Sequence, residues 1–263
     1  ELPPGKVSEL EKRNSTLRVI RYAGLSTSYL LINFSDPVLR KREVREALAK
    51  SINRQEVITH KLAGFGQEAT SILTPNNPYF LSSLKNPEPD LEAAKRLIIA
   101  AGAKNESLIL KTSNNSQAID NGIVLSRQMS GSGLQVNLQR YEWAKFYEDV
   151  KKGRFQLALM RWVGTVDPDI YRLAFHSNES PPGRNRGNYK NPALDQLLDR
   201  AVDIPNTSER KKIYFQVQKI IHQDLAIIPL WYDEQVAILR NVVHGYQPSA
   251  TSDFWPFTEV IKE

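Results

Sequence analysis

The sequence contains no cysteine, which excludes disulfide bonds and thiolate metal sites. It also has no run of about 18 apolar residues, the length that a membrane-spanning helix needs. Its opening stretch, ELPPGKVSELEKR, lacks the apolar core of a signal peptide. A mature exported protein would begin in this way, and so would a truncated one. We therefore expect a chain without a membrane span, and zero cysteines are compatible with an oxidising compartment.

The common catalytic and metal-binding motifs are missing as well. None of the four histidines belongs to an HExxH motif or another close ligand pair, and there is no GxSxG, Walker or GxGxxG segment. We predict no metal, no cofactor and no enzymatic activity. Asp167 and Asp169 could be imagined as an acid/base pair. Carboxylates this close, on either side of a proline, are more typical of a turn followed by a helix cap.

The charge balance is basic, with 35 Lys and Arg against 29 Asp and Glu and a net charge of +6. Such an excess could attract nucleic acid or anionic lipid. The basic residues are scattered, however, and no basic tract interleaved with aromatic residues occurs. We predict a basic protein surface and no nucleic-acid partner. The 263 residues, 41% of them hydrophobic, can form the core of one large or two modest domains.

The stretch from Phe155 to Trp162 is almost entirely apolar, which predicts a strand buried on both faces. Pro168 disfavours helical geometry at the residue before it and suits a first helical turn, so a helix should begin near Asp169. In open α/β sheets, ligands bind beside the carboxyl ends of strands. Trp162, Thr165 and Asp167 are therefore expected at such a site.

Strands and helices alternate along the rest of the chain. Further strands are expected at 17–22, 29–34, 108–112 and 134–141, and at 226–239 as a strand pair or one bent strand. Helices are expected at 43–53, 54–63, 90–101, 117–129 (capped by Ser116), 142–152 and 206–225, and one beginning at Asn191-Pro192. Residues 1–16, 65–89, 177–189 and 241–263 should be irregular. The alternation predicts an α/β fold, a sheet with crossover helices.

One segment, YLLINFSDPVLRKREVREALAKSINRQEVI, resembles a stretch of the family 5 extracellular solute-binding proteins. These are the dipeptide- and oligopeptide-binding components of ABC importers. The matching positions are Asn33, Pro37, Val44, Arg45, Ala47, Leu48, Ile52 and Arg54. Four later segments agree in order with the family pattern: PDLEAAKRLIIAAGA, RWVGTVDPDIY, NRGNYKNPALDQLLDRA and PLWYDEQVAIL.

The resemblance implies the C-terminal lobe of a type II periplasmic binding protein-like clamshell, with a mixed sheet and helices on its faces. Residues 1–28 would be a hinge or remnant of the first lobe, 29–240 the second lobe and 241–263 a segment returning toward the first. The chain would then be part of a longer protein, and its partner would be the missing N-terminal lobe.

The clamshell would close on a peptide or other small solute and dock on the membrane subunits of an ABC permease. Its place would be periplasmic or extracellular and membrane-anchored. A sensor or chaperone of the same family, and a hydrolase that uses Asp167 and Asp169, remain as alternatives.

In peptide-binding relatives, an aspartate just after the cleft tryptophan holds the ligand's α-amino group. The corresponding residue here is Thr165, which can hydrogen-bond but cannot pair with an ammonium. Dipeptide-binding relatives also place an arginine after the strand that corresponds to 108–112, where this chain has Ser113, Asn114 and Asn115. Both differences argue against zwitterionic peptides and leave sugars, longer peptides bound through their backbone, or other solutes open. The predicted ligand-binding residues are Ser113, Asn114, Trp162, Gly164, Thr165, Asp167, Arg184 and Asn185.

For four of these residues the sequence also supports a purely structural role. Trp162 could cap the core, and Asp167 could bond only its own turn. Arg184, like Arg186, could face an anionic ligand or only solvent, and Asn185 could mainly hold its loop in place.

Overall fold

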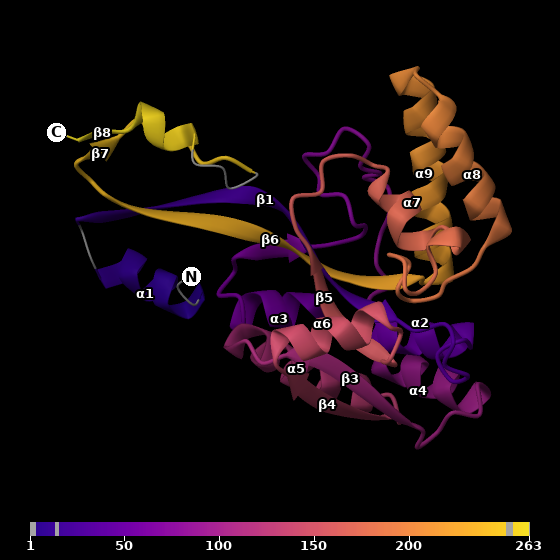
Figure 1. The fold of residues 1–263 in the computed structure, drawn as a ribbon. Helices are drawn as coiled ribbons and strands as arrows, with labels where there is room; N and C mark the ends of the chain where they lie inside the picture. The colour runs from indigo at the N-terminus through magenta and orange to yellow at the C-terminus, as the bar shows by residue number, and fades with distance from the viewer. Residues whose placement is uncertain (1–3, 14–15, 251–254, 263) are drawn as a thin grey trace.

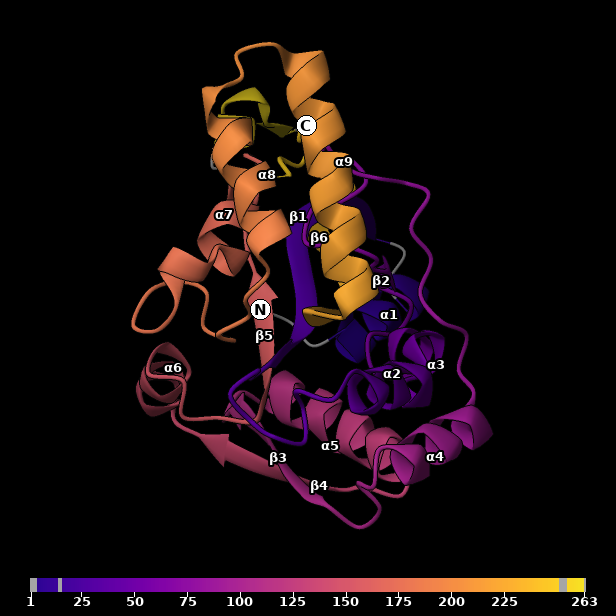
Figure 2. The ribbon, with the colours of Figure 1, turned by 90° about the vertical axis from the view of Figure 1, so that its right-hand side faces the viewer.

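The computed structural model describes residues 4–13, 16–250 and 255–262. Its main feature is a six-stranded mixed sheet in the order β2-β6-β1-β5-β3-β4, with helices on both faces (Figures 1 and 2). The strands are β1 (Leu17–Ile32), β2 (Gly66–Glu68), β3 (Ser107–Ser113), β4 (Gln135–Tyr141), β5 (Leu157–Trp162) and β6 (Ile227–Arg240). The predicted α/β class with a mixed sheet is confirmed.

β5 lies near the middle of the sheet, where parallel and antiparallel pairing meet. It runs antiparallel to β1, with Thr27 opposite Trp162, and parallel to β3, with Lys111 opposite Ala158. β3 is also parallel to β4. The carboxyl ends of β3, β4 and β5 therefore point to the same edge of the sheet, where the sequence predicts the site.

Two apolar cores lie on the two faces of the sheet. Leu30 and Ile32 of β1 face one core with α2 to α5, whereas Tyr29 and Leu31 face the other with α6 to α9. Burying a side chain such as Ile32, which has no exposed surface, stabilises the fold by about 1.5–3 kcal/mol. The alternation of β1 residues between the two cores explains why the strand is apolar on both faces.

The helices largely match the predicted ranges. They are α2 (Arg42–Ser51), α3 (Arg54–His60), α4 (Leu91–Ala100), α5 (Ser116–Ser130), α6 (Trp143–Lys151), α7 (Ile170–Phe175), α8 (Pro192–Asp203) and α9 (Thr207–Asp224). None of the described helices combines the length and the apolar content that crossing a bilayer would require.

The helix starts follow the capping chemistry of the sequence, with one correction. The side chains of Asp90, Asn191 and Asn206 accept hydrogen bonds from the first backbone N–H groups of α4, α8 and α9. The predicted cap at Ser116 is wrong. The Asn115 side chain accepts the bonds from the Gln117 and Ala118 N–H groups, and Ser116 is the first residue of α5.

Four predictions about the chain ends and long strands are corrected or resolved. Residues 17–22 and 29–34 were expected as separate strands, but both belong to β1. Residues 4–13, expected to be irregular, form helix α1 (Pro4–Arg13). The stretch 226–239 is one strand, β6. Within the expected irregular tail, the described part holds β7 (Val243–His244), the short helix η2 (Trp255–Glu259) and β8 (Ile261–Lys262).

The outer halves of β1 and β6 form a two-stranded ribbon that runs out from the lobe, and α1, β7 and β8 lie toward its outer end (Figure 1). The ribbon begins with Leu17 opposite Arg240 and reaches Ala23 opposite Glu234, where the register shifts. Its residues on β1 are half-buried or exposed, whereas β1 is buried from Ser26 onward. The change in burial therefore separates the ribbon from the body of the lobe.

Candidate functional site

An open groove of about 620 Å³ lies at the carboxyl end of β5. This volume is within the range of small-molecule sites. The β5–α7 loop, α7, the end of α8, the start of α9 and the loop after α7 contribute its walls. The lining residues are Trp162, Val163, Gly164, Thr165, Val166, Asp167, Asp169, Ile170, Leu173, Arg184, Val202 and Arg210.

Trp162 connects the groove to the core. Its indole stacks on the ring of Tyr29, with ring centroids 6.2 Å apart and an angle of 9° between the planes. Tyr29 is buried, and burial raises the pKa of its hydroxyl, which therefore stays neutral. Trp162 itself is half-buried and lines the groove, so it both packs against the core and offers surface to a ligand.

The loop after β5 turns apolar side chains outward. Val163 is 69% exposed and Val166 is 60% exposed. Between them, Gly164 has a φ of +67°, which suits glycine because it has no Cβ. Thr165 is buried, and its backbone N–H donates to the carbonyl oxygen of Leu25 at 3.2 Å. The backbone of this wall is therefore anchored to β1 beside the base of the ribbon.

Asp167 is engaged by its own turn and by a cation. Its Oδ1 accepts a hydrogen bond from the Asp169 N–H at 2.8 Å and lies 3.4 Å from Nη2 of Arg210. Arg210 is fixed in turn, because its Nε donates to the carbonyl oxygen of Ala201 at 3.1 Å and its guanidinium lies 5.4 Å from the ring centroid of Tyr214. The predicted turn bond of Asp167 is confirmed.

Asp169 does not cap α7 with its side chain, so that prediction is wrong. Its Oδ1 lies 3.4 Å from the hydroxyl of Tyr214, which can donate to it. Partial burial raises the pKa of the Asp169 carboxyl. The carboxylate thus faces α9 instead of the first backbone N–H groups of its own helix.

The loop after α7 holds two of the predicted ligand-binding residues, and they have different roles. Arg184 lines the groove, is exposed, and has no hydrogen-bond or ion-pair partner in the part of the chain that the structure describes. Asn185 is 1% exposed, and its Nδ2 donates to the carbonyl oxygens of Phe175 and His176 and, at 2.7 Å, of Tyr189. Asn185 therefore pins the loop, the structural role predicted for it, and does not line the groove.

Ser113 and Asn114 also lie outside the groove lining. They follow the pair Lys111–Ala158 at the carboxyl end of β3, with Ser113 opposite Tyr141 of β4. They share the sheet edge with Trp162 but sit on the far side of β5 from β1. Five of the eight predicted residues line the groove, namely Trp162, Gly164, Thr165, Asp167 and Arg184.

Sequence reasoning missed several lining residues. Val163 and Val166 stand inside the segment RWVGTVDPDIY, and their place beside Gly164 after a predicted strand was a usable signal. Val202 and Arg210 come from α8 and α9, and nothing in the sequence indicates that these helix ends meet the end of β5.

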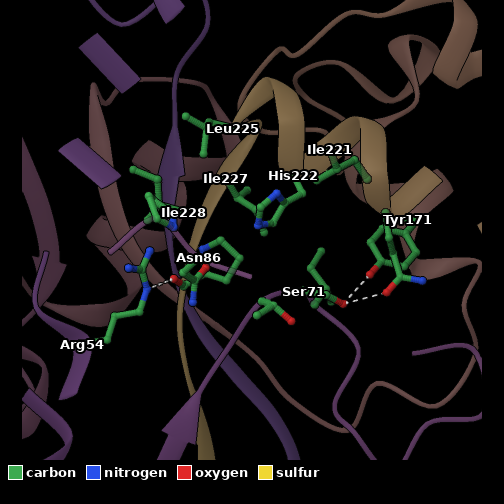
Figure 3. A pocket seen from close by; sticks show the side chains of 14 residues that line it. Arg54, Ser71, Asn86, Tyr171, Ile221, His222, Leu225, Ile227 and Ile228 are labelled. Atoms are coloured by element: carbon green, nitrogen blue, oxygen red, sulfur yellow. Dashed lines mark hydrogen bonds between the residues drawn. The ribbon is translucent and has the colours of Figure 1, made fainter. Parts of the chain in front are cut away.

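A second, much smaller cavity of about 10 Å³ lies between α9 and the segment that follows β2 (Figure 3). The hydroxyl of Ser71 bonds the hydroxyl of Tyr171 at 2.8 Å and Oε1 of Gln218 at 3.1 Å, and Nε of buried Arg54 donates to the carbonyl oxygen of Pro229. This volume fits about one water molecule, so the cavity is too small for a solute. We assign it a structural role.

No group of three or more His, Cys, Asp or Glu side chains that could hold a metal ion occurs among residues 4–13, 16–250 and 255–262. The groove offers a fixed aromatic surface, exposed valines, one neutral buried threonine and a small number of charges. This composition is typical of a site that binds a small molecule through apolar contact and a few placed polar groups.

Comparisons with known proteins agree with the fold and the motifs. The probable di/tripeptide-binding protein 5 of Pseudomonas aeruginosa is 26% identical over 255 residues, which covers 94% of this chain and 48% of that protein. The probable deoxycholate-binding periplasmic protein YgiS of Escherichia coli is 26% identical over 263 residues, covering 96% and 48%. The chain spans about half the length of the curated relatives it matches.

Among solved structures, the periplasmic binding protein DppA from Helicobacter pylori in complex with peptide STSA superposes with a TM-score of 0.88 and 26% identity. The match covers 100% of this chain and 52% of that one. The predicted lobe of a type II periplasmic binding protein is confirmed. The model of the bacterial extracellular solute-binding proteins, family 5 (middle), matches residues 1–181, well over half of the 263 residues, and this chain therefore belongs to that family.

Proposed function

We propose that this chain is one lobe of an extracytoplasmic solute-binding protein and that the groove at the end of β5 is half of its ligand-binding cleft. The ligand would be a peptide or a related small solute, delivered to the permease of an ABC importer. The observation that carries this proposal is the position of the groove. Its wall is anchored to β1 at Leu25, beside the base of the ribbon that leads away from the lobe.

The ribbon of β1 and β6 would act as the hinge. Residues 1–28 and 241–263 would belong to the hinge and the other lobe, and residues 29–240 to this lobe. The change from partial exposure to burial along β1 supports this division. A strand that extends beyond one core must either pack into another core or remain exposed to water. Closure of the second lobe over the groove would bury the exposed valines together with the ligand.

In this proposal the protein binds its solute without chemical change. Asp167 is occupied by its own turn and by Arg210, and Asp169 faces the Tyr214 hydroxyl. Neither carboxylate is paired with a nucleophile or a second acid at a shared substrate position. The complete protein would work outside the cytoplasm, held at the membrane surface beside its permease.

A titration of the ¹⁵N-labelled chain with a peptide library tests the proposal. We expect weak binding in fast exchange, because half of the cleft is missing. The shifts should be confined to the Trp162 indole and the amides of residues 163–169. Val163→Asp places a charge on the exposed apolar wall and should abolish these shifts, whereas Ile123→Asp, on an exposed site of α5, should not.

Chemical-shift changes that are absent, or that spread over the opposite face of the sheet, would contradict the proposal.

A pull-down from membranes, with this protein as bait, distinguishes a transport protein from a sensor or chaperone of the same family. Recovery of permease subunits supports import, and recovery of a receptor supports sensing.

A further inference from the structure

The charges that line the groove are not equally available to a ligand. Two carboxylates and two guanidinium groups are present, from Asp167, Asp169, Arg184 and Arg210. Asp167 and Arg210 form a pair with 3.4 Å between Oδ1 and Nη2, and Asp167 also accepts from a backbone N–H. The Asp169 carboxylate lies against the Tyr214 hydroxyl. Arg184 differs from these three, because the structure shows no hydrogen-bond or ion-pair partner for it among the described residues.

Arg184 projects from a backbone that is fixed on both sides. The Gly183 N–H donates to the carbonyl oxygen of Ser180 at 3.0 Å, and the Asn185 N–H donates to that of Glu179 at 2.8 Å. The Asn185 side chain locks the same loop from inside. A ligand that binds Arg184 must therefore order only its side chain, because the loop is ordered already.

The rest of the groove is apolar or neutral. Val163, Val166 and Val202 are 69%, 60% and 55% exposed, and the indole of Trp162 lies beside them in the lining. Such exposed apolar surface gains most from a ligand with an apolar body. Thr165 offers no formal charge, since its hydroxyl can only hydrogen-bond.

A ligand ammonium would find both lining carboxylates already in contact with described groups. At Asp167 it would compete with Arg210, which is held by the carbonyl oxygen of Ala201 and the rings of Tyr79 and Tyr214. It would also be repelled by Arg184, which shares the groove. A carboxylate meets neither obstacle and can pair with Arg184 in a charge-assisted hydrogen bond.

We propose that this groove selects solutes that combine an apolar body with an anionic group and carry no ammonium. Within peptides, the favoured form is one with a blocked amino terminus and a free carboxylate, in preference to the zwitterion of the same sequence. This inference rests on the proposed function, because it names the ligand class of the same groove.

Four forms of one tripeptide, Ala-Val-Ala, isolate the charge while keeping the side chains constant. They are the N-acetylated acid, the N-acetylated amide, the unmodified zwitterion and the free-amine amide. The chain is titrated with each, and the Trp162 indole N–H and the Thr165 amide are followed by NMR. We expect the acetylated acid to bind about three to ten times more tightly than the zwitterion, and the free-amine amide to bind most weakly.

Arg184→Gln tests the assigned residue. It should weaken binding of the acetylated acid about three- to tenfold and leave the acetylated amide unchanged. Arg96→Gln is the matched control, because Arg96 is exposed on α4 on the opposite side of the sheet. The control should change neither affinity. Raising the salt concentration should reduce the preference for the acid, since exposed charge pairs are screened.

The outcomes distinguish the two proposals. If the zwitterion binds as tightly as the acetylated acid, or if Arg184→Gln weakens both acetylated peptides equally, the charge selection is wrong while the groove remains a peptide site. If none of the four forms shifts the groove resonances, and the library does not either, the proposed function fails together with this inference.

Discussion

The backbone N–H of Thr165 donates a hydrogen bond to the carbonyl oxygen of Leu25, with 3.2 Å between nitrogen and oxygen. Leu25 lies where the pairing of β1 with β6 shifts register, between Ala23 and Thr27. One wall of the groove is therefore attached to the ribbon at the point where the ribbon leaves the sheet. A bend of the ribbon at this point would move the wall directly and would couple the proposed hinge motion to the shape of the groove.

The glycine that precedes this bond gives the first prediction. Gly164 has a φ of +67°, and an added Cβ would meet no atom within 4 Å, so alanine brings backbone strain but no clash. Gly164→Ala should lower the free energy of unfolding by about 1 kcal/mol, measured by urea denaturation. It should also weaken peptide binding, because the flanking Val163 and Thr165 would shift.

Gly5→Ala is the control for that substitution. Gly5 also has open space around it but lies within α1 and has no positive φ. Alanine should raise the free energy of unfolding there by up to about 1 kcal/mol, because it favours the helix. A Gly164→Ala protein as stable as the wild type would show that the loop is not held in the left-handed conformation in solution.

Local sequence patterns predict much of the fold, and the predictions that were wrong have a common cause. β5 and the helix start after Pro168 are fixed by their own residues and were predicted correctly. β1 was predicted as two strands, because residues 17–22 alternate whereas residues 29–34 form a separate apolar run. Its continuity comes from β6, which supplies the pairing across this stretch from more than 200 positions away in the chain.

The same difference between local pattern and long-range packing explains which groove residues could be predicted. Trp162, Gly164, Thr165 and Asp167 follow one strand end, so a rule about strand ends locates them together. Val202 and Arg210 reach the groove through the packing of α8 and α9, which sequence periodicity does not specify. Asn185 belongs to the correct loop, but the direction of its side chain depends on three carbonyl groups that only the folded chain brings together.

Asn185 gives the second prediction. Its side chain is 1% exposed, and its replacement would remove the donor to the carbonyl oxygens of Phe175 and Tyr189, whereas that of His176 would keep the Glu179 N–H. Asn185→Ala should lower the free energy of unfolding by about 2–3 kcal/mol and weaken binding of the acetylated acid by releasing the Arg184 loop. Asn178→Ala, at an exposed position of the same loop, should change both by much less. Equal effects at the two positions would contradict the assigned role of Asn185.

A buried carboxylate away from the groove gives a prediction about pH. Asp149 on α6 is bound by Nζ of Lys111 at 3.0 Å, Nζ of Lys145 at 2.7 Å and Nη2 of Arg154 at 2.8 Å. Burial alone would raise the pKa of Asp149, but the hydrogen bonds from these three cations outweigh it and hold the pKa well below its ordinary range. The unfolded chain, with an ordinary pKa of about 3.9, therefore binds this proton more readily than the folded chain does.

It follows that the stabilisation by Asp149 is complete above about pH 5 and is lost progressively as the pH falls through 4 toward the folded-state pKa. Asp149→Asn should lower the free energy of unfolding at pH 7 by about 2–3 kcal/mol and flatten its dependence on pH below 5. Asp120→Asn, at an exposed site of α5, is the matched control and should preserve the wild-type dependence. Parallel pH curves for wild type and Asp149→Asn would contradict the prediction.

The last prediction separates binding from catalysis. If Asp167 and Asp169 were an acid/base pair, the double variant Asp167→Asn, Asp169→Asn would lose an activity that the wild type has. Their contacts argue otherwise, because Asp167 is committed to Arg210 and to its own turn, and Asp169 to Tyr214. We expect chromatography of peptides incubated with the wild-type chain to show no cleavage, and the double variant to give the same traces. Cleavage by the wild type that disappears in the double variant would support the hypothesis that the protein is a hydrolase. Binding without turnover, by contrast, is what the proposed function requires.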